Sequence, residues 1–104
     1  MKKNYKMKLA GHTFALAKVR FGIHSEETCD FIADLICDNI TIGRVSNEGH
    51  GGATDFYAYS DRVAEATAAL DDVRKEIWLT CADGTVLYHD LGTVADEVLY
   101  KMYV

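Results

Sequence analysis

Two pairs of β-forming runs, each divided by a short turn signal, constrain the fold of this chain more than any other feature. In the first pair, residues 5–10 and 13–21 flank Gly11-His12, and this arrangement predicts a β-hairpin. In the second run the charged residues Lys18 and Arg20 alternate with apolar neighbours. We therefore expect the opposite face of that strand to carry Ala15, Ala17, Val19 and Phe21.

The second pair comprises residues 29–37 and 40–45, which are separated by Asp38-Asn39. Residues 31, 32, 35 and 36 also recur at helical spacing, and Ser25 could cap a helix, so a helix remains an alternative. Apolar and polar residues nevertheless alternate along 29–37, and Asp-Asn is suited to a hairpin turn. The pattern favours strand, turn and strand.

The segment Asn47-Glu48-Gly49-His50-Gly51-Gly52 is too rich in glycine for a regular element, so we expect a loop. Glycine is tolerated where φ is positive or where the backbone approaches another group closely. Successive amides in such a loop can form a concave nest for an anion, and a tight turn is the alternative. The GxxxxGK[ST] and GxGxxG spacings of nucleotide-binding loops are both absent.

A ligand at this loop would also meet side chains from its neighbours. Tyr57 and Tyr59 follow the loop and could stack on a base, although core packing is the alternative for aromatic residues there. Lys18, Arg20 or Arg44 could neutralise a phosphate. The predicted ligand-binding residues are Asn47, Gly49, His50, Gly51, Gly52, Arg44, Tyr57 and Tyr59.

The second half of the chain predicts two amphipathic helices. The first would be capped by Ser60 or Asp61 and carries the stripe Val63, Ala66, Leu70, Val73 and Ile77. The sequence does not define where this helix ends, because Asp83-Gly84 could instead form the turn of a small hairpin between residues 78–81 and 85–88. The second helix would start at a capping-box-like sequence, residues 93–96, with an apolar face of Val94, Val98, Leu99 and Met102.

Length and charge limit the class of protein. A chain of 104 residues fits one domain, residues 1–104, with one hydrophobic core. Its apolar runs are far shorter than the roughly 20 residues that cross a bilayer, so we expect no membrane partner. Residues 1–24 carry six cationic side chains and no acid, but the net charge of −5 disfavours nucleic acid as the main partner.

Cysteine and histidine spacings provide no catalytic or metal motif. Cys29, Cys37 and Cys81 match neither a disulfide scaffold nor a zinc knuckle, which predicts reduced thiols in a cytoplasm. No two histidines have the i, i+4 spacing of a helical zinc motif, so a metal site would need ligands that converge in space. A nucleophile elbow is also absent. We therefore expect no catalytic residue, no metal ion and no cofactor.

A longer pattern follows the first hairpin. It consists of Ser25-Glu26-Glu27-Thr28, Phe31-x-Ala33-x-Leu35, Ile42-Gly43-x-Val45-x-Asn47-x-Gly49-His50-Gly51-Gly52, Asp90-Leu91 and Val94-x-Asp96-x-Val98. This pattern resembles a family of small proteins encoded by phages and other bacterial mobile elements, and the similarity spans about three quarters of the chain. Asn39 stands where that family has a turn glycine, and the basic first hairpin has no counterpart.

The resemblance implies a setting, the cytoplasm of a bacterial host, and carries no established activity. Small phage proteins without catalytic motifs often sequester a host defence molecule or mask a defence protein. This expectation comes from the setting of such proteins and not from particular residues of this chain.

Together these patterns predict an α+β fold in which an antiparallel sheet of about four strands, built from two hairpins, carries two amphipathic helices on one face. The expected function is a non-catalytic, counter-defence binding protein that sequesters an anionic nucleotide-like ligand, as a homo-oligomer whose interface forms the pocket. One alternative is a protein–protein inhibitor whose acidic surface, residues 53–104, docks on a host defence nuclease or sensor. The other is a small hydrolase or metal enzyme built from His50, Glu27 and Asp55.

Overall fold

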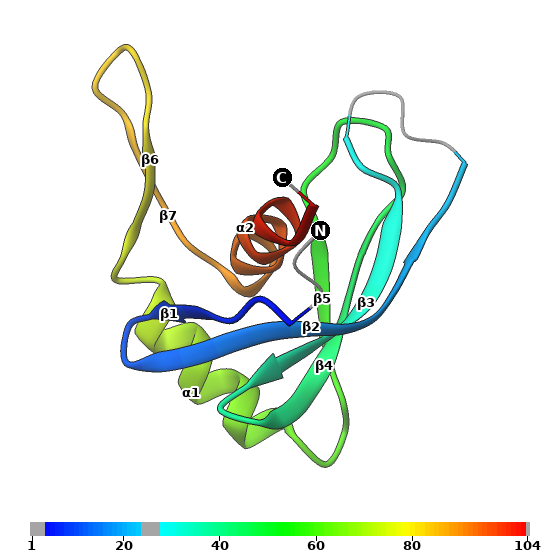
Figure 1. Ribbon diagram of the computed structural model, residues 1–104. Coiled ribbons are helices and arrows are strands. Elements are labelled where there is room, and N and C mark those ends of the chain that lie inside the picture. The colour runs from blue at the N-terminus through cyan, green and yellow to red at the C-terminus, as the bar shows by residue number, and fades with distance from the viewer. Residues whose placement is uncertain (1–3, 24–27, 104) are drawn as a thin grey trace.

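The computed structural model describes residues 4–23 and 28–103, and these form an α+β fold (Figure 1). The elements are β1 (Met7–Leu9), β2 (His12–Phe21), β3 (Phe31–Cys37), β4 (Ile40–Asn47), β5 (Asp55–Ala58), α1 (Val63–Val73), β6 (Ile77–Thr80), β7 (Val86–Tyr88) and α2 (Leu91–Tyr103). Strands β1 to β5 form one antiparallel sheet in chain order, and β6 and β7 form a separate two-stranded sheet. The expected cap at Ser25 lies outside the described residues.

Both expected hairpins are present in the large sheet, but the first turns at Ala10-Gly11 and not at Gly11-His12, because His12 already pairs with Leu9. Ala10-Gly11 link β1 to β2 with φ angles of 54° and 82°, and Asp38-Asn39 link β3 to β4 with 52° and 68°. Two successive positive φ angles are typical of a type I′ turn, whose twist matches that of the flanking strands. The strand interpretation is thus confirmed over Phe31–Cys37, and the helix alternative there is wrong.

The sheet has five strands, one more than expected, because the aromatic stretch after the glycine loop pairs with β4 as β5. Gly43 makes this pairing possible. A Cβ atom at Gly43 would lie 2.6 Å from the ring of Phe56 and would also collide with the carbonyl oxygen of Tyr57. The glycine therefore allows the β5 backbone and the Phe56 ring to lie close against β4.

The burial expected for β2 is wrong over its first half. Phe14 and Leu16 face the core there, and not the neighbouring alanines. A β-bulge with Lys18 at a φ of 53° then interrupts the pairing with β3. Because a bulge shifts the alternation of side chains by one residue, Val19 returns to the core face after it.

The first helix is confirmed, but its cap is not, and its stripe is wrong at both ends, because Val63 is exposed and Ile77 lies in β6. α1 begins at Val63, with Arg62 in the N-cap position and no capping side chain, so neither Ser60 nor Asp61 caps it. The helix ends at Val73, and β6 and β7 then pair around a turn at Asp83-Gly84. The hairpin alternative for this segment is therefore correct.

α2 begins at Leu91, three residues earlier than a cap at Thr93 would place its start. The side chain of Asp90 accepts a hydrogen bond from the Thr93 amide (2.8 Å), while the Asp90 amide donates to the Thr93 hydroxyl (2.9 Å). These reciprocal bonds make Asp90 the N-cap of a capping box. The predicted apolar face, Val94, Val98, Leu99 and Met102, is buried.

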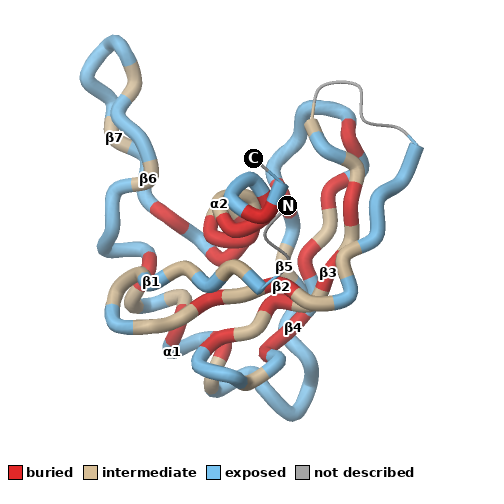
Figure 2. The backbone as a smooth tube through the Cα atoms, in the orientation of Figure 1, coloured by how far each residue is buried: buried red, intermediate tan, exposed pale blue. Residues whose placement is uncertain are grey.

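Both helices pack on one face of the five-stranded sheet and share its core (Figures 1 and 2). The sheet contributes Phe14, Leu16, Phe31, Ala33, Leu35, Ile42 and Val45 to that core. The other face, which we call the open face, carries cross-strand rows such as Ala17, Asp34, Arg44 and Tyr57. Among the described residues, neither helix is long and apolar enough to cross a membrane.

Candidate functional site

Asn47, the last residue of β4, organises the glycine-rich loop. Its side-chain oxygen accepts a hydrogen bond from the amide of Gly49 (2.8 Å), and its side-chain nitrogen donates to the carbonyl of Gly52 (3.0 Å). Gly49 and Gly51 have φ angles of 84° and 90°, which explains why glycine is favoured at both positions. The loop is therefore closed around one buried asparagine.

A chain of hydrogen bonds continues from Asn47 to α2. Thr28 donates its hydroxyl hydrogen to the Asn47 side-chain oxygen (2.6 Å) and accepts a hydrogen bond from the Gly51 amide (3.3 Å). On the other side, the Asn47 side-chain nitrogen donates to Thr54 (3.1 Å), whose hydroxyl donates to Asp96 (2.5 Å). Such linked bonds polarise and strengthen one another.

These bonds occupy amides that we expected to bind an anion. Of the three glycine amides in the predicted nest, those of Gly49 and Gly51 donate to side-chain oxygens of the protein itself. The tight-turn interpretation thus accounts for the glycines. A concave anion nest needs several N–H groups aimed at one point, and two of the three predicted for it are already bonded within the protein.

A groove opens next to this loop, above α2. In Figure 1, α2 lies between the β6–β7 hairpin and the upper ends of β3 and β4. The groove has a volume of about 760 Å³ and is lined by Phe21, Thr28, Cys29, Asn47, Gly51, Gly52, Ala53, Trp78, Asp96, Leu99, Tyr100 and Tyr103. Its size is within the range of small-molecule sites, about 300–1,000 Å³.

Aromatic rings dominate the walls of the groove. Phe21 and Tyr103 contact each other edge to face, with ring centroids 5.2 Å apart and an interplanar angle of 81°. Tyr100 is 63% exposed and Trp78 is partly buried, so both present ring surface to the groove. Aromatic pairs with this geometry provide rigid walls against which a flat ligand can pack.

Among the described residues of the groove lining, Asp96 supplies the one carboxylate. Burial raises its pKa above the ordinary value, while the hydrogen bond from Thr54 acts in the opposite direction. The lining contains no lysine, arginine or histidine among the described residues. The described lining is consequently aromatic, with one carboxylate that can accept hydrogen bonds.

The sequence-predicted site residues fall into two groups on different faces of the sheet. Asn47, Gly51 and Gly52 line the groove, whereas Gly49 is buried within the loop and His50 is exposed on it. Arg44 and Tyr57 lie opposite each other on the open face. The structure therefore does not gather the predicted residues into one site.

Tyr59 belongs to the open face as well. It borders a shallow depression of about 240 Å³ together with Lys18, Arg20, Asp34 and Arg44. Its hydroxyl donates to Asp34, and this hydrogen bond raises the pKa of Tyr59. The cations expected to meet a phosphate are thus close together, but on the side of the sheet away from the groove.

Four aromatic groove residues were missed by sequence reasoning. The prediction of α2 used only its apolar face. Tyr100 and Tyr103 lie three residues apart in the same helix, and this spacing could have indicated a shared aromatic face. Phe21 and Trp78 gave no such signal, because they reach the groove from strands 57 residues apart in sequence.

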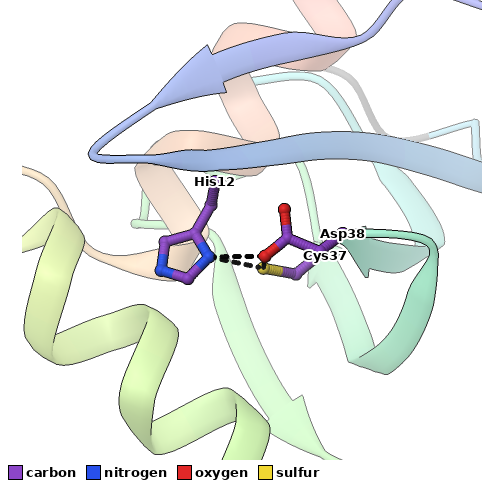
Figure 3. Close-up of side chains that lie close together, drawn as sticks. All are labelled: His12, Cys37 and Asp38. Atoms are coloured by element: carbon purple, nitrogen blue, oxygen red, sulfur yellow. Dashed lines mark hydrogen bonds and ion pairs between the residues drawn. The ribbon is translucent and has the colours of Figure 1, made fainter.

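A second polar cluster lies at the other end of β2 (Figure 3). We call it the His12 cluster, and it comprises His12, Cys37, Asp38 and Asp72. The His12 ring bonds Asp38 through Nδ1 and Asp72 through Nε2, each at 2.7 Å. The Cys37 sulfur lies 3.5 Å from Nδ1.

The charges of the His12 cluster stabilise one another. Hydrogen bonds to Asp38 and then Asp72 raise the pKa of His12, and the bond from His12 lowers the pKa of Asp38. Burial, followed by the nearby Asp38 carboxylate, raises the pKa of Cys37 to about 12. The thiol therefore stays protonated, which is not the state of a catalytic thiolate.

Comparison with protein-family models, with curated proteins and with solved structures found no match to this chain.

Proposed function

We propose that this protein is a non-catalytic binding protein whose groove takes a flat aromatic ligand, such as a nucleobase or nucleoside. The observation that carries the proposal is the grouping of four aromatic side chains around Asp96, the one carboxylate among the described lining residues, which is partly buried. Stacking on aromatic rings binds any base through its face, and a carboxylate accepts hydrogen bonds from amino or imino groups on its edge.

The side chains that line the groove favour a base without phosphates over the anionic nucleotide-like ligand expected from the sequence. A phosphate in the groove would lie near the Asp96 carboxylate. The described lining residues include no lysine or arginine that could neutralise it. Lys18, Arg20 and Arg44 border the depression on the open face, so the sheet separates them from the groove. Like charges at close range disfavour binding, and a base without phosphates avoids this cost.

Binding is favoured over catalysis by the few reactive groups in the groove. The described lining residues include one carboxylate and no histidine or lysine, so they lack the paired acid and base that hydrolysis uses. Of the alternative hydrolase residues, His50 is exposed on the glycine loop, Asp55 begins β5, and Glu27 lies outside the described residues.

The resemblance to proteins of phages and mobile elements suggests a purpose for such binding. A small protein made in the cytoplasm of a bacterial host could remove a defence signal from solution simply by holding it. The groove is open to solvent along α2, and we propose that a second copy of the chain completes it, as in a homo-oligomer.

A protein–protein inhibitor is the second candidate function, and the β6–β7 hairpin favours it. This hairpin exposes Ile77, Leu79, Leu87 and Tyr88. Residues 53–104 also contain ten acidic and four basic side chains, which would complement a basic partner such as a nuclease.

Trp78 allows a direct test, because it is the only tryptophan in the chain and it lines the groove. Titration with free bases and nucleosides should change its fluorescence, and the matching nucleotides should bind more weakly because of Asp96. Tyr100→Ala should raise the Kd about 5- to 100-fold, since a stacked base is worth roughly 1–3 kcal/mol.

Tyr57→Ala is the matched control, because Tyr57 is 58% exposed, close to the 63% of Tyr100, but lies on the open face. It should leave the titration unchanged. A Trp78 signal that responds to none of these compounds, or an equal loss of binding in both variants, would contradict the proposal.

A further inference from the structure

The fold brings three potential metal ligands together at the turns of two hairpins. His12 begins β2, Cys37 ends β3, and Asp38 is the first residue of the β3–β4 turn. His12 and Cys37 are 25 residues apart in sequence, yet one ligand atom from each of the three residues lies within 4.8 Å of the others. Figure 3 shows the three side chains pointing toward one another.

The distances between these atoms approach those of a tetrahedral zinc site. His12 Nδ1 lies 3.5 Å from Cys37 Sγ and 2.7 Å from Asp38 Oδ2, and Sγ and Oδ2 are 3.7 Å apart. Zinc bonds of about 2.0–2.3 Å at tetrahedral angles place nitrogen, oxygen and sulfur ligands roughly 3.3–3.6 Å apart. Two of the three separations already fit closely, and the third, between Nδ1 and Oδ2, needs to widen by about 0.6 Å.

The groups behind these ligands hold them in position. His12 Nε2 donates to Asp72 of α1 at 2.7 Å, which leaves Nδ1 as the ring nitrogen directed at Cys37 and Asp38. The other oxygen of Asp38, Oδ1, accepts the amide hydrogen of Thr13 at 2.8 Å. A histidine ligand backed by a carboxylate is the usual second layer of a zinc site, and it orients the ring.

Access to the cluster suits an ion that binds from solution. The Cys37 side chain is buried, that of His12 is 19% exposed, and that of Asp38 is 50% exposed. An ion entering from the Asp38 side would meet the sulfur at the inner end of the site. One coordination position would remain for water, as in zinc sites with three protein ligands.

We propose that His12 Nδ1, Cys37 Sγ and Asp38 Oδ2 bind a zinc ion, with Asp72 as the positioning residue for His12. The ion takes the place of the proton on Nδ1 and of the thiol proton, and both protons go to solvent. The bound ion links the β1–β2 turn to the β3–β4 turn and, through Asp72, both turns to helix α1. This site is independent of the groove and of the function proposed for it.

Metal titration of the untagged protein, first stripped with a chelator, tests this proposal. Zinc competed against a chromophoric chelator should bind with one-to-one stoichiometry. Cobalt should give the visible bands of a tetrahedral ion together with a thiolate-to-cobalt charge-transfer band, because Cys37 is a ligand. Asp72→Asn should weaken zinc binding 10- to 100-fold while keeping the charge-transfer band.

Cys37→Ser should abolish the charge-transfer band, whereas Cys81→Ser, which changes a partly exposed cysteine at the β6–β7 turn, should keep it. Circular dichroism shows whether each variant is folded, and Asp38→Asn provides a second test at an exposed position if the buried Cys37 tolerates no change. Folded Cys37→Ser or Asp38→Asn protein that binds zinc as tightly as the wild type would overturn the proposal. So would cobalt binding without a thiolate band.

Discussion

At the scale of single residues, one side-chain amide determines the structure of the glycine loop. Asn47 both accepts and donates, so it satisfies the Gly49 amide, the Gly52 carbonyl and two threonine hydroxyls at once. No buried side-chain nitrogen or oxygen of the described residues lacks a hydrogen-bond partner. A loop satisfied in this way is a preformed wall of the groove, and it does not need a ligand to order it.

Asp96 gives a pH-dependent prediction at this scale. Burial raises its pKa in the folded state, so its contribution to stability is greatest below the unfolded pKa and is lost as the pH rises through the folded pKa. Asp96→Asn, which keeps an oxygen to accept the Thr54 hydroxyl hydrogen, should therefore unfold at higher urea concentration than the wild type at pH 7. The difference should shrink toward pH 4, and a difference independent of pH would contradict the assignment.

At the scale of elements, the start of α2 packs directly on the connection between β4 and β5. Gly92 in the first turn of α2 is buried, and a Cβ atom there would collide with the carbonyl oxygen of Thr54. The contact places α2 against the loop that walls the groove. It also explains a glycine in a helix, where the residue is otherwise unfavourable.

Gly92→Ala tests this contact against helix propensity. Alanine should add about 1 kcal/mol to the helix, but the collision with backbone should cost about 1–3 kcal/mol or more, so we expect net destabilisation. Gly52→Ala is the control, because a Cβ atom there has nothing within 4 Å. Urea denaturation of both variants measures the two effects, and a Gly92→Ala protein more stable than the wild type would show that α2 moves freely away from Thr54.

At the scale of the whole molecule, the β6–β7 hairpin projects from the body that carries the shared core (Figures 1 and 2). A lone two-stranded sheet is only marginally stable in water. This one exposes four large apolar side chains, of which Ile77 and Tyr88 are 56% and 55% exposed and lie directly opposite each other. An exposed apolar patch of this kind is typical of an interaction surface.

We expect the hairpin to mediate association of two copies. Ile77→Lys should convert a dimer to a monomer, because a charge at the centre of an apolar interface is costly to bury. Light scattering coupled to gel filtration measures the mass, and Tyr57→Lys on the open face is the control that should stay dimeric. A wild-type chain that is monomeric at all concentrations would leave the hairpin available to a different protein and favour the inhibitor candidate.

The sequence by itself determined the local structure of this protein. Asp38-Asn39 specified a turn, alternating residues specified β3, and the spacing of Val94, Val98 and Met102 specified the buried side of α2. Each of these depends on residues within a few positions of one another. Backbone sterics and side-chain periodicity act over that range, so they can be inferred from the order of residues alone.

Only the tertiary structure decided which residues share a site. The bulge at Lys18 reset the face of β2, and the sheet divided the predicted site residues between the groove and the open face. His12 forms a hydrogen bond with Asp72, 60 residues away, only because α1 packs beside the first hairpin. Contacts of this range depend on how whole elements pack, and no local pattern encodes them.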